Sequence, residues 1–85
     1  MTMKDRMERK LTSGFHPQQL EIVDESEDHR GHGGYLEGGE THFRVLMRAR
    51  SLKGMSRVAR QRAVMSCLKA EMDERVHALA LDVDV

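Results

Sequence analysis

The sequence predicts one small α+β domain whose elements follow in the order helix, strand, strand, helix, strand. Three observations lead to this fold class. An apolar residue occurs at every fourth position near the start, and side chains in the middle alternate with a period of two. A long amphipathic segment then precedes a final apolar run. These elements share one core most simply as a three-stranded mixed sheet with helices on one face. No internal repeat or linker divides the chain, so residues 1–85 are expected to form a single domain.

The first helix is predicted from Met3, Met7 and Leu11, which lie four residues apart with charged side chains between them. Gly14 is expected to end this helix. The strand that follows is predicted over residues 20–26, which are rich in β-forming side chains. The apolar residues of the first helix therefore form one face that is available for packing.

Residues 27–39 contain five of the seven glycines, and they predict a mobile loop between the first two strands. The second strand is predicted over residues 41–50, where the side chains alternate with a period of two. One face of this strand is expected to be largely buried, and it carries Thr41, Phe43, Val45, Met47 and Ala49.

A long helix is predicted over residues 56–72, after a turn at Gly54 and with Ser56 as its N-cap. The third strand is predicted over residues 76–83, with His77 at its start on the face of Leu79, Leu81 and Val83. The helix is expected to bury Val58, Val64, Met65, Leu68 and Met72 and to turn Arg57, Arg60, Arg62 and Lys69 toward water.

The formal net charge is +0, but the charges are unevenly distributed along the sequence. Seven acidic residues and one base lie between residues 21 and 40, whereas eight bases and no acid lie between residues 41 and 70. This asymmetry predicts a basic face, which is either a solvated surface or a partner surface. The single cysteine, Cys67, indicates a reducing compartment, and no segment resembles a signal peptide or a membrane span. A soluble cytoplasmic protein is therefore expected.

Three histidines are candidate metal ligands: His77 in the last strand, and His29 and His32 in the glycine-rich loop. A lone histidine near a core is most often a structural residue, and His-x-x-His spacing alone is a weak signal. A self-sufficient zinc site is not expected, because such a site needs four ligands and Cys67 is predicted to be a small core residue on a helix. His77 with one loop histidine would be an incomplete pair that needs thiolates from a partner.

The sequence contains no catalytic constellation. It has no nucleophile elbow, no phosphate-binding loop and no convincing pair of carboxylates. An enzyme that acts on a small-molecule substrate is therefore not expected. His16 and His42 are interpreted as structural or surface residues.

Three segments together resemble the BolA family of small proteins, in the family's order and with similar spacing. The resemblance extends over nearly the whole chain. It implies the same order of elements, with a short helical turn around residues 51–54, in an arrangement similar to the class II KH fold. Gln61 is a departure, because relatives typically have histidine there. The three segments are Leu20-Glu21-Ile22-Val23-Asp24-Glu25-Ser26, Gly39-Glu40-Thr41-His42-Phe43 and Val76-His77-Ala78-Leu79-Ala80-Leu81.

The BolA resemblance implies a monothiol glutaredoxin as partner and a shared [2Fe–2S] cluster. In this family the histidine at the position of His77 is an iron ligand, and a loop histidine or cysteine is a second one. Here that second ligand is His29 or His32, with His29 slightly favoured. The glutaredoxin contributes its cysteine and a bound glutathione, so the isolated chain is expected to carry no cofactor. The implied function is a non-enzymatic adaptor in iron–sulfur cluster assembly or iron homeostasis.

Two alternatives stay open. BolA relatives have been linked to transcriptional regulation, and a DNA-binding regulator would use the basic helix over residues 56–72. Its phosphate or groove contacts would be Lys53, Arg57, Arg60 and Arg62. The other alternative is an interaction module without any metal.

Overall fold

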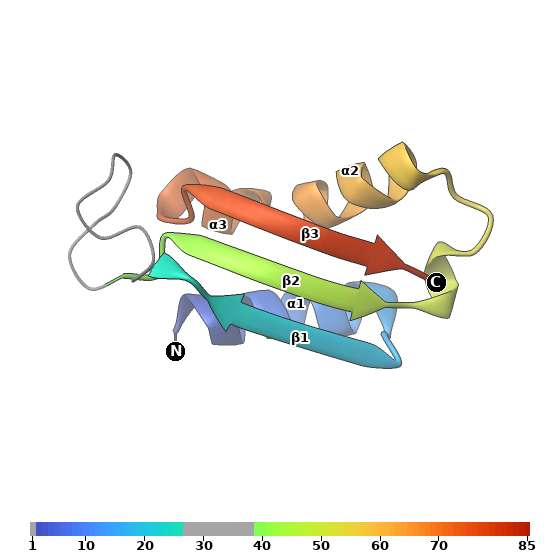
Figure 1. Ribbon diagram of the computed structural model, residues 1–85, viewed down its shortest axis with the longest axis horizontal. Helices are drawn as coiled ribbons and strands as arrows, with labels where there is room; N and C mark the ends of the chain where they lie inside the picture. Colours follow the sequence, from blue (N-terminus) through green and yellow to red (C-terminus); the bar gives the residue numbers. More distant parts are fainter. Residues whose placement is uncertain (1, 27–38) are drawn as a thin grey trace.

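The computed structural model describes residues 2–26 and 39–85 (Figure 1). The predicted order of elements is confirmed, with the second long helix divided in two. Residues 27–38, which make up most of the predicted glycine-rich loop, lie outside the described residues. The elements are α1 (Met3–Phe15), β1 (Gln19–Asp24), β2 (His42–Arg48), the 3₁₀ helix η2 (Arg50–Leu52), α2 (Arg57–Cys67), α3 (Lys69–Glu74) and β3 (Ala78–Asp84).

The three strands form one mixed sheet in the order β1-β2-β3. β1 pairs antiparallel with β2, and β2 pairs parallel with β3. A parallel pair needs a crossover, and α2 and α3 provide it by carrying the chain from the end of β2 back to the start of β3. Figure 1 shows the helices behind the sheet, on one of its faces. The predicted mixed sheet with helices on one face is therefore confirmed, while the likeness to the class II KH fold stays a prediction.

α1 begins at a capping box, in which the Thr2 hydroxyl oxygen accepts from the Asp5 N–H and the Asp5 carboxylate accepts from the Thr2 N–H. The helix ends at Phe15, one residue beyond the predicted end, because His16 adopts a left-handed conformation (φ 48°) and its N–H donates to the Thr12 carbonyl oxygen. The three apolar residues that predict this helix are all buried against the sheet, as expected.

The inner face of the sheet supplies the other half of the core. Phe43, Val45 and Met47 of β2 are buried and alternate with more exposed residues, as predicted for a strand with one buried face. In the paired register, Ile22 of β1 lies beside Val45, which in turn lies beside Leu81 of β3. One apolar layer therefore runs across all three strands beneath the helices.

The buried stripe of the second long helix differs from the prediction. Val58 is 58% exposed and Met65 is 38% exposed, whereas Val64 and Leu68 are buried as predicted. The helix is divided at Leu68, where the backbone leaves the helical conformation. The inner stripe passes through Val64, Leu68 and Glu71, which are four and three residues apart and so share one side. A charged residue occupies a position in the core, and periodicity of apolar residues does not identify it.

Glu71 is buried because two cations of α1 pair with it. Lys10 Nζ donates to Glu71 Oε1 and Arg6 Nη2 donates to Glu71 Oε2, both at 2.9 Å. Burial acts to raise the pKa of Glu71, but the hydrogen bonds from Lys10 and Arg6 and the charge of Lys10 outweigh it and leave that pKa below its ordinary value. Arg60, predicted to face water, is also turned inward: its side chain is only 19% exposed, and its Nη1 lies 2.7 Å from Asp84 Oδ1.

His77 precedes β3 instead of lying within it, since the strand begins at Ala78. The backbone N–H groups of His77 and Ala78 both donate to the Thr41 carbonyl oxygen, at 2.6 and 3.1 Å. Two successive N–H groups directed at one acceptor interrupt the alternation that a regular strand would impose. His77 is exposed, whereas Leu79 and Leu81 pack against the core. The prediction that His77 shares their face is therefore wrong.

Candidate functional site

His77 lies at the end of the sheet where β1 ends and where β2 and β3 begin, on the left of Figure 1. Its side chain is exposed, but its backbone is fixed by the hydrogen bond to Thr41 and by the burial of Val76 immediately before it. An exposed imidazole on a fixed backbone is suited to complete the coordination of a metal that another molecule brings.

The ring of His77 lies against the ring of His42, the first residue of β2. The ring centroids are 5.8 Å apart and the planes are inclined by 51°, which is a normal geometry for a tilted aromatic pair. His42 is buried, and its Nδ1 lies 2.8 Å from the Thr41 hydroxyl oxygen. The interpretation of His42 as a structural residue agrees with this burial, but sequence reasoning did not bring it together with His77.

The base of the glycine-rich loop is fixed at the same end of the sheet. The Thr41 N–H donates to the Ser26 hydroxyl oxygen at 2.8 Å, which joins the residue before the loop to a residue after it. Arg75 Nε donates to the Gly39 carbonyl oxygen, and the N–H of Met3 donates to Glu40 Oε1. Ser26 is therefore bonded to Thr41, which also accepts from the His77 N–H, and Gly39 is bonded to Arg75, two residues before His77.

The backbone at the end of the loop requires special conformations. Gly39 has φ +73°, and a Cβ atom at this position would lie 3.4 Å from the Ser26 Cβ. Glu40 also has a positive φ of 62°, which is uncommon for a residue other than glycine. Its side chain, bonded to the N-terminus of α1, helps to hold that conformation. The close approach of Ser26 and Gly39 depends on this turn.

The described residues contain no group of three or more histidine, cysteine, aspartate or glutamate side chains that could hold a metal ion. Of the three candidate ligands, the structure places only His77, because His29 and His32 lie outside the described residues. Cys67 is partly buried, and its Sγ donates to the Lys10 carbonyl oxygen at 3.6 Å. Burial raises the pKa of the Cys67 thiol, which disfavours the thiolate that a metal would need. The described residues thus offer an incomplete set of metal ligands.

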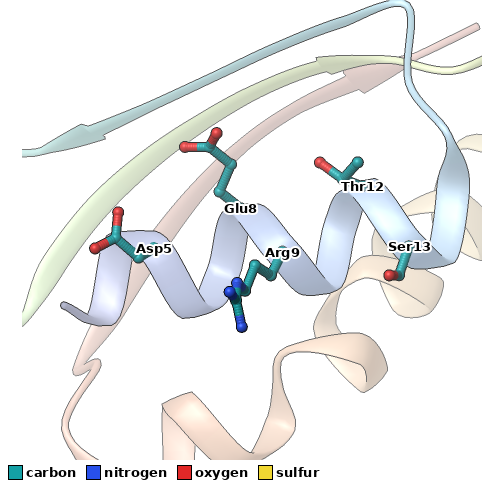
Figure 2. Close-up of a pocket in the computed structure, with 5 residues that line it drawn as sticks. All are labelled: Asp5, Glu8, Arg9, Thr12 and Ser13. Carbon is teal, nitrogen blue, oxygen red and sulfur yellow. The ribbon is translucent and has the colours of Figure 1, made fainter. Parts of the chain in front are cut away.

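Two of the surface hollows in the described part of the chain adjoin α1 and the start of β2 and β3. A shallow hollow along α1 is lined, among the described residues, by side chains of that helix, five of which Figure 2 shows. A smaller hollow adjoins the start of β2 and β3 and includes Glu25, His42 and Arg44, with Glu25 and Arg44 forming an ion pair. The lining residues of the α1 hollow are Asp5, Glu8, Arg9, Thr12 and Ser13.

Among the described residues, no helix is long and apolar enough to span a bilayer.

The candidate nucleic-acid residues fall into two groups. Lys53, Arg57 and Arg62 are exposed. Arg60 instead binds Asp84 at the edge of β3, where its guanidinium is largely covered. Exposed Val58 and Met65 lie on α2 together with Arg62, so this surface is both basic and apolar. The structure therefore leaves three of the four cations open to a partner.

Comparisons with known proteins agree on one family. The family model described as BolA-like protein matches residues 11–84. The chain is 45% identical over 83 residues to a Sinorhizobium sp protein from the cobS 5′ region, covering 96% of this chain and 89% of that protein. It is 38% identical over 81 residues to the DNA-binding transcriptional regulator BolA of Escherichia coli K12, covering 95% and 73%. BolA1 from Arabidopsis thaliana has a similar structure, with a TM-score of 0.87, 32% identity and coverage of 99% and 92%.

Proposed function

This chain belongs to the BolA family, and we propose that it is a non-enzymatic cytoplasmic adaptor in iron–sulfur cluster assembly or iron homeostasis. In this proposal it binds a monothiol glutaredoxin and shares a [2Fe–2S] cluster with it. The observation that carries the proposal is the exposed ring of His77, held by a fixed backbone beside the anchored base of a loop with two more histidines.

The donor set fits a shared cluster better than a site within one chain. A [2Fe–2S] cluster needs four protein or glutathione ligands, and this chain offers imidazoles but no available thiolate in its described part. The glutaredoxin cysteine and its bound glutathione supply the thiolates in the proposal. Imidazole in place of thiolate raises the reduction potential of such a cluster.

The second ligand is His29 or His32. His29 lies three residues after Ser26, a span of about 10 Å at full extension, and His32 lies six residues after it, about 20 Å. The Thr41 N–H donates to Ser26 Oγ and the Thr41 carbonyl oxygen accepts the His77 N–H, so Ser26, from which these spans are counted, is joined to His77 through one residue. Chain length therefore allows either ring to serve, with His29 favoured by its place in the family-like segment.

Titration of this chain into a cluster-loaded monothiol glutaredoxin, followed by visible circular dichroism, tests the proposal. We expect a new spectrum that is complete at one-to-one stoichiometry, because the cluster gains imidazole ligands. His29→Ala and His32→Ala form a matched pair, and only the variant that removes the second ligand should alter the new spectrum. An unchanged glutaredoxin spectrum with the wild-type chain would contradict the shared cluster and leave an interaction module without metal.

DNA binding is the second candidate function. A relative from Escherichia coli is named as a DNA-binding transcriptional regulator, and Lys53, Arg57 and Arg62 are exposed here. Phosphate contacts release counterions, so affinity for duplex DNA should fall steeply with salt. Replacement of Arg57 or Arg62 by glutamine should reduce the slope of log affinity against log salt by about one each. The matched control is Lys4→Gln, a cation removed from α1. An affinity for duplex DNA that changes neither with the salt concentration nor on replacement of the two arginines would exclude this function.

A further inference from the structure

β3 is an edge strand, because the sheet order β1-β2-β3 gives it β2 as its one neighbour within the described residues. The Ala78 N–H donates to the Thr41 carbonyl oxygen, and the Asp84 carbonyl oxygen accepts from the residue after β2. Backbone groups alternate in direction along a strand, so Leu79 and Leu81 direct their N–H and C=O groups away from β2. Such an edge is a template on which another strand can pair.

A hollow lies between this edge and α2, which Figure 1 shows beside β3. We call it the α2–β3 groove. Its lining consists of Arg57, Arg60 and Gln61 from α2 and residues 81–84 from β3. Val58 and Met65 lie three residues before and four residues after Gln61, so they share its side of the helix. Both are exposed, and the groove is therefore bordered by apolar surface as well as by cations.

The cations of the groove are not fully balanced by its acids. Asp84 pairs with Arg60, and Asp82 pairs with Arg48 of β2. Arg57 is exposed and makes no ion pair with a described residue. In addition, Arg60 Nε is buried and has no hydrogen-bond partner in the described part of the chain. A segment with carboxylates would therefore meet one unpaired cation and a second cation with an unused donor.

Two comparisons favour a negatively charged partner at this edge. The hollow beside the free edge of β1 includes Lys4, Glu8 and Glu21, so charges of both signs border it. At the β3 edge, α2 contains three arginines and no acid. A second copy that paired antiparallel through β3 would place two such helices beside each other on one face, where they would repel.

We propose that the α2–β3 groove binds an extended acidic segment of a partner protein, which adds to β3 as a fourth strand. The backbone groups of Leu79 and Leu81 supply the strand pairing. Arg57 and Arg60 bind carboxylates on the side of the segment that faces α2. The added strand also covers the exposed Val58. No metal and no residue of the proposed cluster site takes part.

Nuclear magnetic resonance of the full chain with a synthetic peptide tests the proposal. The peptide alternates glutamate and threonine over seven residues, the length of β3. Binding should slow hydrogen exchange at the Leu79 and Leu81 N–H groups, because both gain hydrogen bonds. A peptide with lysine in place of glutamate should leave their exchange unchanged. Unchanged exchange at millimolar glutamate peptide would overturn the proposal, and so would equal effects of the two peptides.

A matched pair of variants tests the charge. Arg57→Gln removes the unpaired cation, and it should weaken binding of the glutamate peptide about threefold to fivefold. Lys4→Gln, beside the β1 edge, should leave that affinity unchanged. Equal affinity in Arg57→Gln and the wild type would contradict selection of an acidic segment.

Two further outcomes would assign the groove to another occupant and overturn the proposal. In the first, a duplex DNA shifts the signals of Gln61 and Leu81 while the glutamate peptide does not. In the second, exchange at Leu79 and Leu81 slows with rising protein concentration when no peptide is present, which would show that a second copy pairs there.

Discussion

Replacement of His77 by alanine is expected to leave a folded protein that no longer shares a cluster with a glutaredoxin. The imidazole is exposed and its backbone N–H, which holds the turn before β3, is kept in the variant. The free energy of unfolding should therefore change by no more than about 0.5 kcal/mol. The visible circular dichroism of the mixture should equal that of the glutaredoxin alone, because an iron ligand has been removed.

His16→Asn is the matched control for the loss of one exposed imidazole. His16 lies at the end of α1 in a left-handed conformation that asparagine tolerates. Its substitution should leave the shared-cluster spectrum unchanged. If His77→Ala gives the same spectrum as the wild type, with the same stoichiometry, His77 is not a ligand. If His16→Asn abolishes the spectrum too, the effect reflects general binding and not ligation.

The sheet and α1 were predictable because their apolar residues follow the period of the element. Met3, Met7 and Leu11 recur every four residues on a helix with one buried side, and β2 buries every second residue. In both elements burial is one-sided, so local spacing contains the information. The strand boundaries differ from prediction by a few residues, since hydrogen bonds between distant segments decide where pairing ends.

The inner stripe of α2 and α3 was not predictable from the same kind of pattern. Glu71 is on the inner side because Arg6 and Lys10 pair with it, and these residues lie 65 and 61 positions earlier in the sequence. The apolar pattern predicts that Val58 and Met65 are buried, but both side chains are exposed. No pattern in the neighbouring sequence marks a charged residue as buried. The inner side of α2 and α3 can therefore be identified only when the position of α1 is known.

The candidate site shows the same limit. The family-like segment around His77 points to this residue, but its position before β3 depends on the two hydrogen bonds from His77 and Ala78 to the Thr41 carbonyl oxygen. The contact between the rings of His77 and His42 follows from the parallel register of β2 and β3, which places His42 beside Ala78, the residue after His77. The segment Gly39-Glu40-Thr41-His42-Phe43 resembles the family, but the sequence favours a structural or surface role for its histidine and does not connect it with His77. His29 and His32 stay predictions.

Replacement of Glu71 by glutamine is expected to give the largest loss of stability among the polar substitutions in this chain. The Glu71 side chain is fully buried, whereas Arg6 and Lys10 are 31% and 39% exposed. The two cations can regain water when the carboxylate is lost, so the cost resembles that of hydrogen bonds to a charged group and not that of a fully buried unpaired charge. We expect the free energy of unfolding to fall by about 2 kcal/mol near neutral pH.

The control is Glu74→Gln, which removes the other carboxylate that pairs with Arg6. Glu74 is exposed at the surface, and surface ion pairs contribute little to stability. Its replacement should change the free energy of unfolding by no more than about 0.5 kcal/mol. Denaturant unfolding of the three proteins measures both values. Equal losses in the two variants would contradict a special role for the buried carboxylate.

The dependence on pH identifies the charge of Glu71 as the cause. The pKa of Glu71 is lower in the folded protein than its ordinary value of 4.5, so the folded state binds the proton less tightly than the unfolded state. Its stabilisation is complete above pH 4.5 and is lost as the pH falls through the folded pKa. The difference between wild type and Glu71→Gln should therefore be constant near neutral pH and shrink below pH 4.5. A difference that stays constant in acid would point to shape instead of charge.

Glu71→Gln should also separate stability from ligand chemistry. The Glu71 carbonyl oxygen accepts the N–H groups of Arg75 and Val76, both at 3.0 Å, and so ends α3 just before His77. This backbone acceptor is unchanged in the variant. While the protein stays folded, Glu71→Gln should give the wild-type spectrum with cluster-loaded glutaredoxin, in contrast to the stable but inactive His77→Ala. Loss of the spectrum in folded Glu71→Gln would show that the pairing of α1 with α3 also shapes the metal-binding end of the sheet.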